Sequence, residues 1–438
     1  MAIVKKKKKL LFINDYFYPD VASTGQLLTE LCLELQHEFD VTVIASSGYA
    51  DSDEGSVRKR RRIVQEKLEG IHIHRIGLSK PDKKSKLSRL IHISVFFALA
   101  FRVILKEKRV AAIYTTSQPP ILAGLLGSMA KLLKRCKFVY NIQDFNPEQA
   151  EAVNFVSRRW VTELARKVDK FSCRRADHIV LVGRDMGETL KKRFKGKPVP
   201  EYTVINNWID EQSVTPLAKS DPGVSMFLRE YKLENKFVVM YSGNIGLYYD
   251  LENLIKVASM LEGLPDVRFA FVGEGAVKED MERYVQTHGL CNVVFIPYQP
   301  RERLLYSLNA ADIHLVVNQK GIKGVSVPSK VYGVLATGKP VLGVLEEGSE
   351  AATLIQESRS GLVVEPGQYE GAAQAIRTIA AMSDEMRELM GMRGRTYLEE
   401  YLRKDVSLMK YKQLFASLVA DGFIDVGRPA RMGATESK

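Results

Sequence analysis

The sequence has few of the features that mark metal-binding, disulfide-bonded or membrane-spanning proteins. Its cysteines form no C-x-x-C pair, which argues against a metal knuckle or a disulfide framework and favours a reducing cytoplasm. The seven histidines show no H-E-x-x-H spacing, and the sequence contains no G-x-S-x-G segment, the motif that holds the nucleophilic serine of many hydrolases. No run of 18 apolar residues occurs, so no membrane-spanning helix is predicted. The four cysteines are Cys32, Cys136, Cys173 and Cys291.

What the chain does contain is an uneven distribution of charge. Its net charge is +12, but residues 1–210 hold 38 basic and 23 acidic side chains, and the remainder has a net charge of −3. At 438 residues, with 45% hydrophobic and 26% charged residues, the composition is that of a soluble globular protein with two or three domains. The asymmetry suggests that two domains meet different partners.

Two segments resemble membrane-directed ones. The run Lys5–Lys9 followed by LLFI imitates a signal peptide, but its apolar part ends at Asn14, and a buried first strand is the better interpretation. The segment Leu90–Leu105 is apolar around most of its circumference and has Lys and Arg on both sides. The apolar segment itself is more typical of a helix packed in a core, whereas its basic flanks are typical of a helix that lies on an anionic membrane surface.

Short apolar runs alternate with helical patterns along both halves of the chain. Unbroken apolar strands of this kind indicate parallel sheets covered on both faces, which predicts an α/β protein with two doubly wound, Rossmann-like domains. The expected strands are Leu10–Ile13, Val41–Ala45, Ile71–Ile76, Ala112–Thr115, Phe138–Asn141, His178–Val182, Tyr202–Ile205, Phe237–Tyr241, Arg268–Val272, Val293–Ile296, Ile313–Val317, Val341–Val344 and Leu362–Val364.

The same pattern divides the chain into expected regions. Residues 1–206 form the first domain, and residues 207–236, polar and without a strand pattern, form a linker. Residues 237–402 form the second domain, and residues 403–422 form a helix that could pack back on the first domain. Residues 423–438, rich in Gly, Pro, Arg and Ser, form a frayed tail.

Two loops of the second half are candidate anion sites, because ligands of open parallel sheets bind beyond the carboxyl ends of the strands. Gly243 and Gly246, with Asn244 between them, follow one strand and precede a helical pattern, so backbone N–H groups and the helix dipole could attract a phosphate. Ser329 could cap the next candidate helix, and Lys330 lies in its first turn. A lysine is unfavourable there unless an anion is also present. An unliganded turn and a solvated lysine are the alternatives.

Other strand ends contribute further candidates. Gly275 lies in half of a dinucleotide fingerprint that lacks its third glycine, so no redox cofactor is expected, and Tyr298 could border a base. In the first half, Gly25 lies at the start of a helix, and Asp144 follows a strand, where it either faces a substrate or caps a helix. The D-x-D segment Asp51–Asp53 and the run Arg58–Arg62 are interpreted as surface, so no metal site is expected.

Taken together, these stretches resemble a family-4 glycosyltransferase of the GT-B fold, of the bacterial colanic-acid, capsule or O-antigen type. The resemblance extends to about Phe415 and rests on six segments in this order: TGQLLTELCLEL, YNIQDFNPEQA, VINNWID, YSGNIGLYYDLENLI, AADIHLVV and VPSKVYGVLATGKPVLGV. It implies two Rossmann-like domains facing across a cleft, with the nucleotide-sugar donor in the second and the acceptor in the first. It also implies retention at the anomeric carbon and no bound metal or other cofactor.

The resemblance assigns roles to individual residues. Gly243, Asn244, Gly246 and Lys330 would surround the diphosphate, Gly25 would approach it across the cleft, and Asp144 would border the transferred sugar or the acceptor hydroxyl. Gly275, Tyr298 and Ser329 complete the expected donor-binding set, and Asp144 and Lys330 are the expected catalytic residues.

One departure from the family concerns two glutamates separated by seven residues. Val325 and Gly333 occupy those positions here, so contacts to the donor sugar and ribose must come from elsewhere, with Glu350 as the candidate, or be absent. The implied activity is transfer of a hexose or N-acetylhexosamine from a UDP- or GDP-sugar to a lipid-linked glycan by a cytoplasmic protein peripheral to the membrane. A nucleotide-sugar epimerase and a non-enzymatic binder of nucleic acid or membranes are the alternatives.

Overall fold

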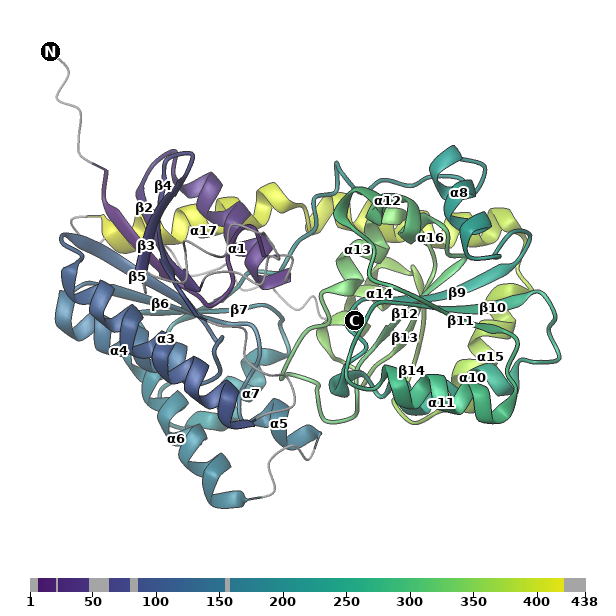
Figure 1. Ribbon diagram of the computed structural model, residues 1–438, viewed down its shortest axis with the longest axis horizontal. Coiled ribbons are helices and arrows are strands. Elements are labelled where there is room, and N and C mark those ends of the chain that lie inside the picture. Colours follow the sequence, from purple (N-terminus) through teal and green to yellow (C-terminus); the bar gives the residue numbers. More distant parts are fainter. Residues whose placement is uncertain (1–6, 21–22, 47–62, 79–85, 154–157, 421–438) are drawn as a thin grey trace, which may run out of the picture.

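The computed structural model describes all residues except 1–6, 21–22, 47–62, 79–85, 154–157 and 421–438. The described chain forms two α/β domains, each built on a largely parallel sheet covered by helices (Figure 1). The doubly wound architecture expected from the sequence is therefore confirmed. The segment Asp51–Asp53, the run Arg58–Arg62 and the tail from residue 423 lie outside the described residues.

The first domain contains an eight-stranded sheet in the order β3-β4-β2-β1-β5-β6-β7-β8. Every neighbouring pair is parallel except β3 and β4. The strands are β1 (Lys9–Ile13), β2 (Asp40–Ser46), β3 (Ile63–Leu68), β4 (Ile71–Ile76), β5 (Val110–Thr116), β6 (Lys137–Ile142), β7 (His178–Leu181) and β8 (Tyr202–Val204).

Strand β3 is absent from the strands expected from the sequence. It forms an antiparallel hairpin with β4 at the edge of the sheet, and the two strands are joined by Glu69 and Gly70. Its side chains are only partly buried or exposed along its whole length, as in many edge strands. Reasoning from continuous buried runs therefore missed it, because an edge strand with one solvated face needs no such run.

The second domain contains a six-stranded, fully parallel sheet in the order β11-β10-β9-β12-β13-β14. All six strands were expected from the sequence. They are β9 (Phe237–Ser242), β10 (Val267–Val272), β11 (Val293–Ile296), β12 (Ile313–Val317), β13 (Val341–Val344) and β14 (Gly361–Val364). The order reverses direction at β9 and β12, and such a switch point is where doubly wound sheets bind ligands.

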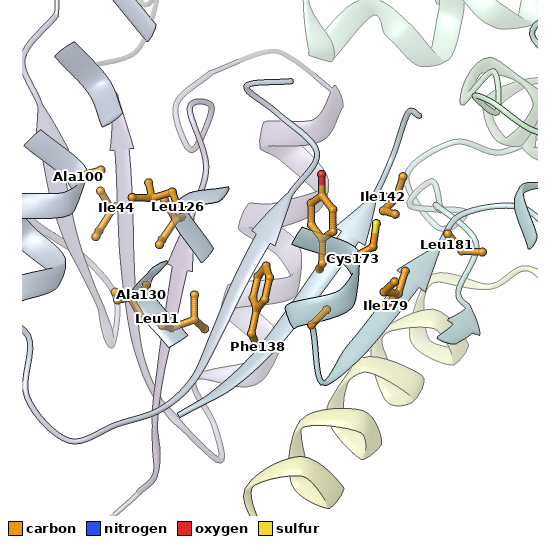
Figure 2. Packing of buried hydrophobic residues seen from close by; sticks show 14 of the residues in the cluster. Leu11, Ile44, Ala100, Leu126, Ala130, Phe138, Ile142, Cys173, Ile179 and Leu181 are labelled. Carbon is orange, nitrogen blue, oxygen red and sulfur yellow. The ribbon is translucent and has the colours of Figure 1, made fainter. Parts of the chain in front are cut away.

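Each sheet has a hydrophobic core on both faces, because successive side chains of a strand point in opposite directions. In β1, Leu11 and Ile13 belong to one buried cluster, whereas Leu10 and Phe12 belong to the cluster on the other face. Figure 2 shows the first of these clusters, in which Leu11 and other strand residues meet residues of the covering helices. The second sheet repeats the pattern with its own clusters.

The helices of the first domain are α1 (Ser23–Leu35), α3 (Lys86–Lys106), α4 (Leu122–Lys134), α5 (Glu148–Ala152), α6 (Arg159–Arg175) and α7 (Met186–Phe194). Those that follow are α8 (Pro222–Glu230), the 3-10 helix η1 (Leu247–Tyr249), α9 (Leu251–Leu254), α10 (Lys256–Met260), α11 (Lys278–His288), α12 (Arg301–Asn309), α13 (Lys330–Thr337), α14 (Glu350–Ser358), α15 (Tyr369–Ala380), α16 (Asp384–Tyr401) and α17 (Lys404–Val419).

Helix α3 contains the apolar segment Leu90–Leu105. One of its faces packs into the first domain, where Phe96, Ala100 and Ile104 are buried in the core. Its other face leaves Ile91 and Leu105 more than half exposed. Core packing therefore explains one side of this helix but not the other. Among the described helices, none combines the length and the apolar character that a membrane crossing requires.

The segment expected as a linker, residues 207–236, contains helix α8. Asp221 caps this helix by accepting hydrogen bonds from two backbone N–H groups, and Pro222 occupies its first position. Phe227 and Leu228 are buried in a second-domain cluster with strand residues of β9 and β10. The Asp-Pro-Gly sequence is thus a helix start rather than part of an extended linker, an arrangement that suits proline because the first helical N–H needs no partner.

Helix α17 follows the second domain in sequence but packs against the first (Figure 1). Leu408, Tyr411 and Phe415 are buried in the same cluster as residues of β1, β2 and α1. The Phe415 ring lies 5.7 Å from that of Phe12 and 6.1 Å from that of Tyr114, in edge-on or tilted contacts. Segments about 400 residues apart in sequence therefore complete one core.

Replacing Phe415 with Ala is expected to lower the free energy of unfolding by about 3–5 kcal/mol, because it removes a fully buried ring and leaves a cavity. Chemical denaturation followed by tryptophan fluorescence would measure this. The matched control is Met409→Ala on the same helix, where the side chain is 54% exposed and the change should stay within about 0.5 kcal/mol. Similar losses in both variants would contradict the packing of α17.

Candidate active site between the two domains

Loops at the carboxyl ends of strands from both sheets meet where the domains touch. The loop after β6 carries Asp144, whose backbone forms an isolated antiparallel bridge with Ser326 of the second domain. The backbone N–H of Phe145 donates a hydrogen bond of 2.8 Å to the Val325 carbonyl. Asp144, expected from the sequence to face a substrate, therefore lies at the junction of the two domains.

Lys330 is a partly buried cation at the start of α13. Its Nζ lies 3.9 Å from the centre of the Tyr249 ring and 5.1 Å from that of Tyr241, so the ammonium rests on two aromatic faces. Within the part of the chain that the structure describes, no carboxylate lies within ion-pair distance of it. Burial lowers the pKa of Lys330 to about 7. A desolvated cation at a helix N-terminus, with no anion beside it, is suited to receive one.

Gly243 provides the space that the Lys330 side chain occupies. Its φ is +140°, a backbone conformation that residues with side chains rarely adopt, and a Cβ there would lie 2.4 Å from Cε of Lys330. Any larger residue would displace the lysine. Gly243 and Lys330, selected from separate loops of the sequence, are thus brought into direct contact.

The turn after β9 offers only some of its backbone N–H groups. That of Gly243 already donates to the Val272 carbonyl at the end of β10 over 2.8 Å, and that of Ile245 donates to the Glu274 carbonyl in the following loop over 2.9 Å. Those of Asn244 and Gly246 have no backbone acceptor among the described residues. The Asn244 carbonyl accepts from the Tyr241 hydroxyl over 2.6 Å, which holds the turn above the strand. If the turn binds an anion, Asn244 and Gly246 therefore supply the donors.

Gly275 has a structural reason to be glycine. A Cβ there would lie 2.0 Å from the Ile245 carbonyl oxygen, and one at Gly273 would lie 2.0 Å from that of Gly243. The loops after β9 and β10 are therefore stacked at backbone contact. A donor contact of Gly275 remains a prediction, while its support of the neighbouring turn follows from the structure.

Of two local expectations about helix starts, one is wrong. The turn Gly243–Gly246 is followed by η1 and a left-handed Asp250 before α9 begins, and α9 continues through Ile255, which is in the helical conformation, into α10. A helix dipole acting at this turn therefore stays a prediction. Ser329 makes no side-chain capping hydrogen bond to α13. Lys330 itself is the first residue of α13, so its ammonium lies at a helix N-terminus.

Two tyrosines border the lysine. Burial and the nearby charge of Asp144 raise the pKa of Tyr249 to about 12, so its hydroxyl stays protonated and lies within electrostatic reach of the first domain. Tyr298, expected to border a base, is 57% exposed, and its contact with a base remains a prediction. Tyr249 belongs to one of the six family-like segments, but sequence reasoning assigned it no role. The signal that could have found it is its place between the glycine turn and the next helix.

The Asp144 side chain is held by amides and a hydroxyl. Its Oδ1 accepts from Nε2 of Gln149 over 3.0 Å, and its backbone N–H donates to Oγ of Ser117 over 3.1 Å. Burial raises the pKa of the Asp144 carboxyl, and hydrogen bonds from Ser326, Gln118 and Gln149 oppose that rise. The carboxyl is thus positioned by neutral donors and has no cation beside it among its described partners.

Arg193 of α7 supports the loop that carries Asp144, and sequence reasoning missed it. Its guanidinium lies 4.7 Å from the centre of the Phe145 ring and donates to the Asn146 carbonyl over 3.1 Å. It also pairs with Asp169 and Glu148. Its charge is paired and both terminal guanidinium nitrogens donate hydrogen bonds, while the buried Nε has no acceptor among the described residues. These contacts to the Phe145 ring, the Asn146 carbonyl and the two carboxylates hold the loop in place.

Glu350 joins the two domains. Its side chain is 2% exposed, and its Oε2 accepts from the backbone N–H and Nε of Arg184 over 2.7 and 3.1 Å. Its Oε1 accepts from Nδ2 of Asn206 over 3.1 Å. These first-domain groups occupy the carboxylate in this structure. A contact between Glu350 and a donor sugar remains a prediction.

Val325 and Gly333, which replace the family's glutamates, lie in apolar surroundings. Val325 is 6% exposed and belongs to the hydrophobic core of the first domain, although it lies in the second half of the sequence. Gly333 is buried in α13, 3.8 Å from Leu308 when given a Cβ. A carboxylate at Val325 would enter that core, so an apolar residue fits this interdomain contact.

Gly25 lies in the first turn of α1. A Cβ there would lie 3.2 Å from that of Tyr16, and its carbonyl accepts from Oγ1 of Thr29 over 2.8 Å. Its expected approach to a diphosphate across the cleft remains a prediction. Within the described residues, no three His, Cys, Asp or Glu side chains are grouped as a metal site would require.

Family models match both domains. Residues 24–208 match a glycosyl transferase 4-like domain, and residues 227–397 match the glycosyl transferases group 1 model. The chain is 25% identical over 348 residues to the probable glycosyltransferase WbjE of Pseudomonas aeruginosa, covering 79% of this chain and 84% of that one. It is 28% identical over 320 residues to the putative colanic acid biosynthesis glycosyl transferase WcaI of Escherichia coli, covering 70% and 75%.

Solved structures share the fold. Sucrose-phosphate synthase from Thermosynechococcus elongatus superposes with a TM-score of 0.73 at 16% identity, covering 94% of this chain and 99% of that one. HepE from Anabaena, solved with UDP-glucose, superposes with a TM-score of 0.67 at 16% identity, covering 94% and 100%. With both domain models matched in order and this architecture, the chain belongs to the two-domain GT-B glycosyltransferases that carry a family-4-like domain followed by a group 1 domain.

Proposed function

We propose that this glycosyltransferase moves a sugar from a nucleoside diphosphate sugar to a lipid-linked glycan, with retention at the anomeric carbon, in the synthesis of a cell-surface polysaccharide. The observation that carries the proposal is Lys330, a desolvated cation without a carboxylate partner among the described residues. It is set against the glycine turn and against Tyr249, which lies within electrostatic reach of Asp144. The UDP-glucose complex of Anabaena HepE and the colanic-acid assignment of WcaI support the donor and acceptor classes.

The proposed chemistry follows from where charge develops. Breaking the sugar–phosphate bond puts negative charge on the leaving diphosphate and positive charge on the sugar ring. Lys330 and the N–H groups of Asn244 and Gly246 stabilise the departing anion, and groups of this kind are typically worth about 3–4 kcal/mol each. The acceptor hydroxyl attacks from the face that the diphosphate leaves, and the diphosphate takes its proton.

Asp144 is proposed to hold a hydroxyl of the sugar or of the acceptor. Its loop is docked onto the second domain, so the carboxyl enters the site only when the domains are together. The ion pairs of Arg184 with Glu350 and Glu357 add to this contact, at 3.1 and 3.0 Å. A closed site of this kind excludes water and so limits hydrolysis of the donor.

The acceptor and the location are proposed from charge. Residues 1–210 carry a net charge of +15, and basic residues near an anionic membrane add about 1 kcal/mol each to its attraction. A cytoplasmic protein held peripherally at the inner face of the membrane would meet a lipid-linked glycan there. The outward apolar side chains of α3 are consistent with such a position.

The proposal is tested by thermal unfolding with UDP-, GDP- and ADP-sugars. A true donor at a hundredfold excess over its Kd should stabilise the protein by about 2.7 kcal/mol, because only the folded state binds it. With lipid-linked acceptor added, the product anomer is read by NMR. Inversion would refute the retaining assignment, turnover without acceptor would indicate an epimerase, and no stabilisation by any of the three classes would refute the donor site.

Lys330→Met is expected to weaken the binding of whichever nucleotide sugar stabilises the protein by about 10- to 100-fold, because a hydrogen bond from a charged group is lost. In the native protein, burial lowers the pKa of Lys330 to about 7, so the ammonium is present below that pH and is lost above it. Donor affinity should therefore be constant below pH 7 and fall as the pH rises, whereas the variant should lack this dependence. Calorimetric titration at several pH values measures both, and Lys330→Arg, always charged, is the control. The same pH profile in native protein and Met variant would remove Lys330 from the site.

Asp144→Asn is expected to lower kcat by about 100-fold, within the range for a lost catalytic carboxyl, while donor affinity stays within a factor of about three. Steady-state rates and donor titration separate the two effects. Asp266→Asn, at a largely exposed carboxyl paired with Lys236, is the matched control and should behave like the native protein. An unchanged kcat in a folded Asp144→Asn variant would contradict a direct role for the carboxyl.

A further inference from the structure

Helix α6 exposes an apolar stripe. Trp160, Leu164 and Phe171 are 62%, 55% and 39% exposed, and their spacing of four and seven residues places them on one side of the helix, over about 16 Å of its length. The opposite side is buried through Thr162, Asp169, Ser172 and Cys173. The α6 stripe, defined here as Trp160, Leu164, Lys167 and Phe171, therefore faces away from the domain.

The charge around the α6 stripe is almost entirely positive. Lys167 lies within it and is exposed, and Arg174 and Arg175 are exposed in the last turn. The Arg175 guanidinium lies 5.3 Å from the centre of the Phe171 ring. Glu163 is the one carboxylate among the exposed residues of the helix. Aromatic and apolar side chains mixed with Lys and Arg are the composition of helices that lie in an anionic membrane interface.

Neighbouring helices extend this surface. Helices α3, α4 and α6 cover the same side of the first sheet (Figure 1), and α4 contacts both of the others. Helix α3 exposes Ile91, Val95 and Leu105, and the end of α4 exposes Leu132 and Leu133. The exposed apolar groups are therefore spread over three helices of the basic domain and are not gathered in one groove. Such a distribution suits a broad, flat, negatively charged partner.

The second domain provides the contrast. Helix α16 exposes Met386, Leu389 and Tyr401 to a similar extent, at 57%, 56% and 55%. Five acidic and three basic residues lie on that helix, and the half of the chain that contains it has a net charge of −3. Exposed apolar side chains thus occur on both domains, but those of the first domain, α6 included, are accompanied by an excess of positive charge.

We propose that the α6 stripe is a docking surface for an anionic lipid bilayer, with Trp160, Leu164 and Phe171 entering the interface and Lys167, Arg174 and Arg175 meeting the headgroups. This deepens the proposed function, since a lipid-linked acceptor lies in such a bilayer. It also assigns the contact chiefly to α6 rather than to the more apolar α3, whose most apolar face is buried in the core.

The two tryptophans of the chain allow a direct test without donor or acceptor. Trp160 is exposed, whereas Trp208 is 7% exposed and donates its ring N–H to Glu30 over 2.8 Å. Vesicles of phosphatidylcholine with phosphatidylglycerol should shift the fluorescence of the native protein to shorter wavelength, and brominated acyl chains should quench it. Vesicles of phosphatidylcholine alone should do neither, and Trp160→Phe should abolish both responses.

Vesicle co-sedimentation then tests the stripe as a whole. The triple variant Trp160→Ala, Leu164→Ala, Phe171→Ala should bind the anionic vesicles at least about tenfold more weakly. The matched control, Met386→Ala, Leu389→Ala, Tyr401→Ala on α16, should bind as the native protein does. Raising the salt concentration should weaken binding of the native protein, because headgroup attraction is screened.

Equal vesicle binding by the stripe variant and the native protein, or binding that ignores phosphatidylglycerol, would overturn the proposal. So would sedimentation analysis that found a dimer in the native protein and a monomer in the stripe variant, since the surface would then join two copies. These readouts need no turnover. A protein that transfers sugar but ignores vesicles would refute the docking surface alone, and one that binds vesicles but no nucleotide sugar would refute the proposed donor.

Discussion

The site depends on the electrostatics of one ammonium group, that of Lys330, which burial deprives of water while its described surroundings supply aromatic faces instead of a carboxylate. The pKa of Lys330, lowered to about 7, reflects the free-energy cost of removing its charge from water. The cation–π contacts with the two tyrosines offset only part of that cost. Neighbouring features serve the same group: Gly243 leaves room for its stem, and Gly273 and Gly275 let the supporting loops stack. An arriving diphosphate would supply the missing negative charge.

The loop that leads into Lys330 also belongs to the packing of the other domain. Val325 and Val327 are buried in the core of the first domain, and the Gly324 N–H donates to Asp185 over 2.8 Å. The position of the lysine is therefore coupled to the contact between domains. Any movement that separates the domains must withdraw Val325 and Val327 from that core. We therefore expect the domains to separate in one cooperative step rather than gradually.

Much of the fold could be predicted because buried parallel strands such as β9 and β12 are continuous apolar runs, and Gly243 and Lys330 could be selected because both follow such strands. Strand β3 escaped because a half-exposed edge strand lacks that run. The sequence did not reveal the roles of Tyr249 and Arg193, nor the interdomain contacts of Val325 and Glu350. These roles depend on contacts between distant segments, which no local sequence pattern encodes. The left-handed Asp250, which separates η1 from α9, is a backbone conformation that this residue type does not predict.

Helix α17 has a consequence for how the protein is made. The face of the first sheet that contains Phe12 and Tyr114 is closed by Tyr411 and Phe415, which the ribosome adds long after the strands they cover. During synthesis that apolar face, which α1 also covers in part, lacks these two side chains while the whole second domain is translated. The core of the first domain therefore cannot be completed until α17 has been made, and the apolar surface left open until then is of the kind that chaperones recognise.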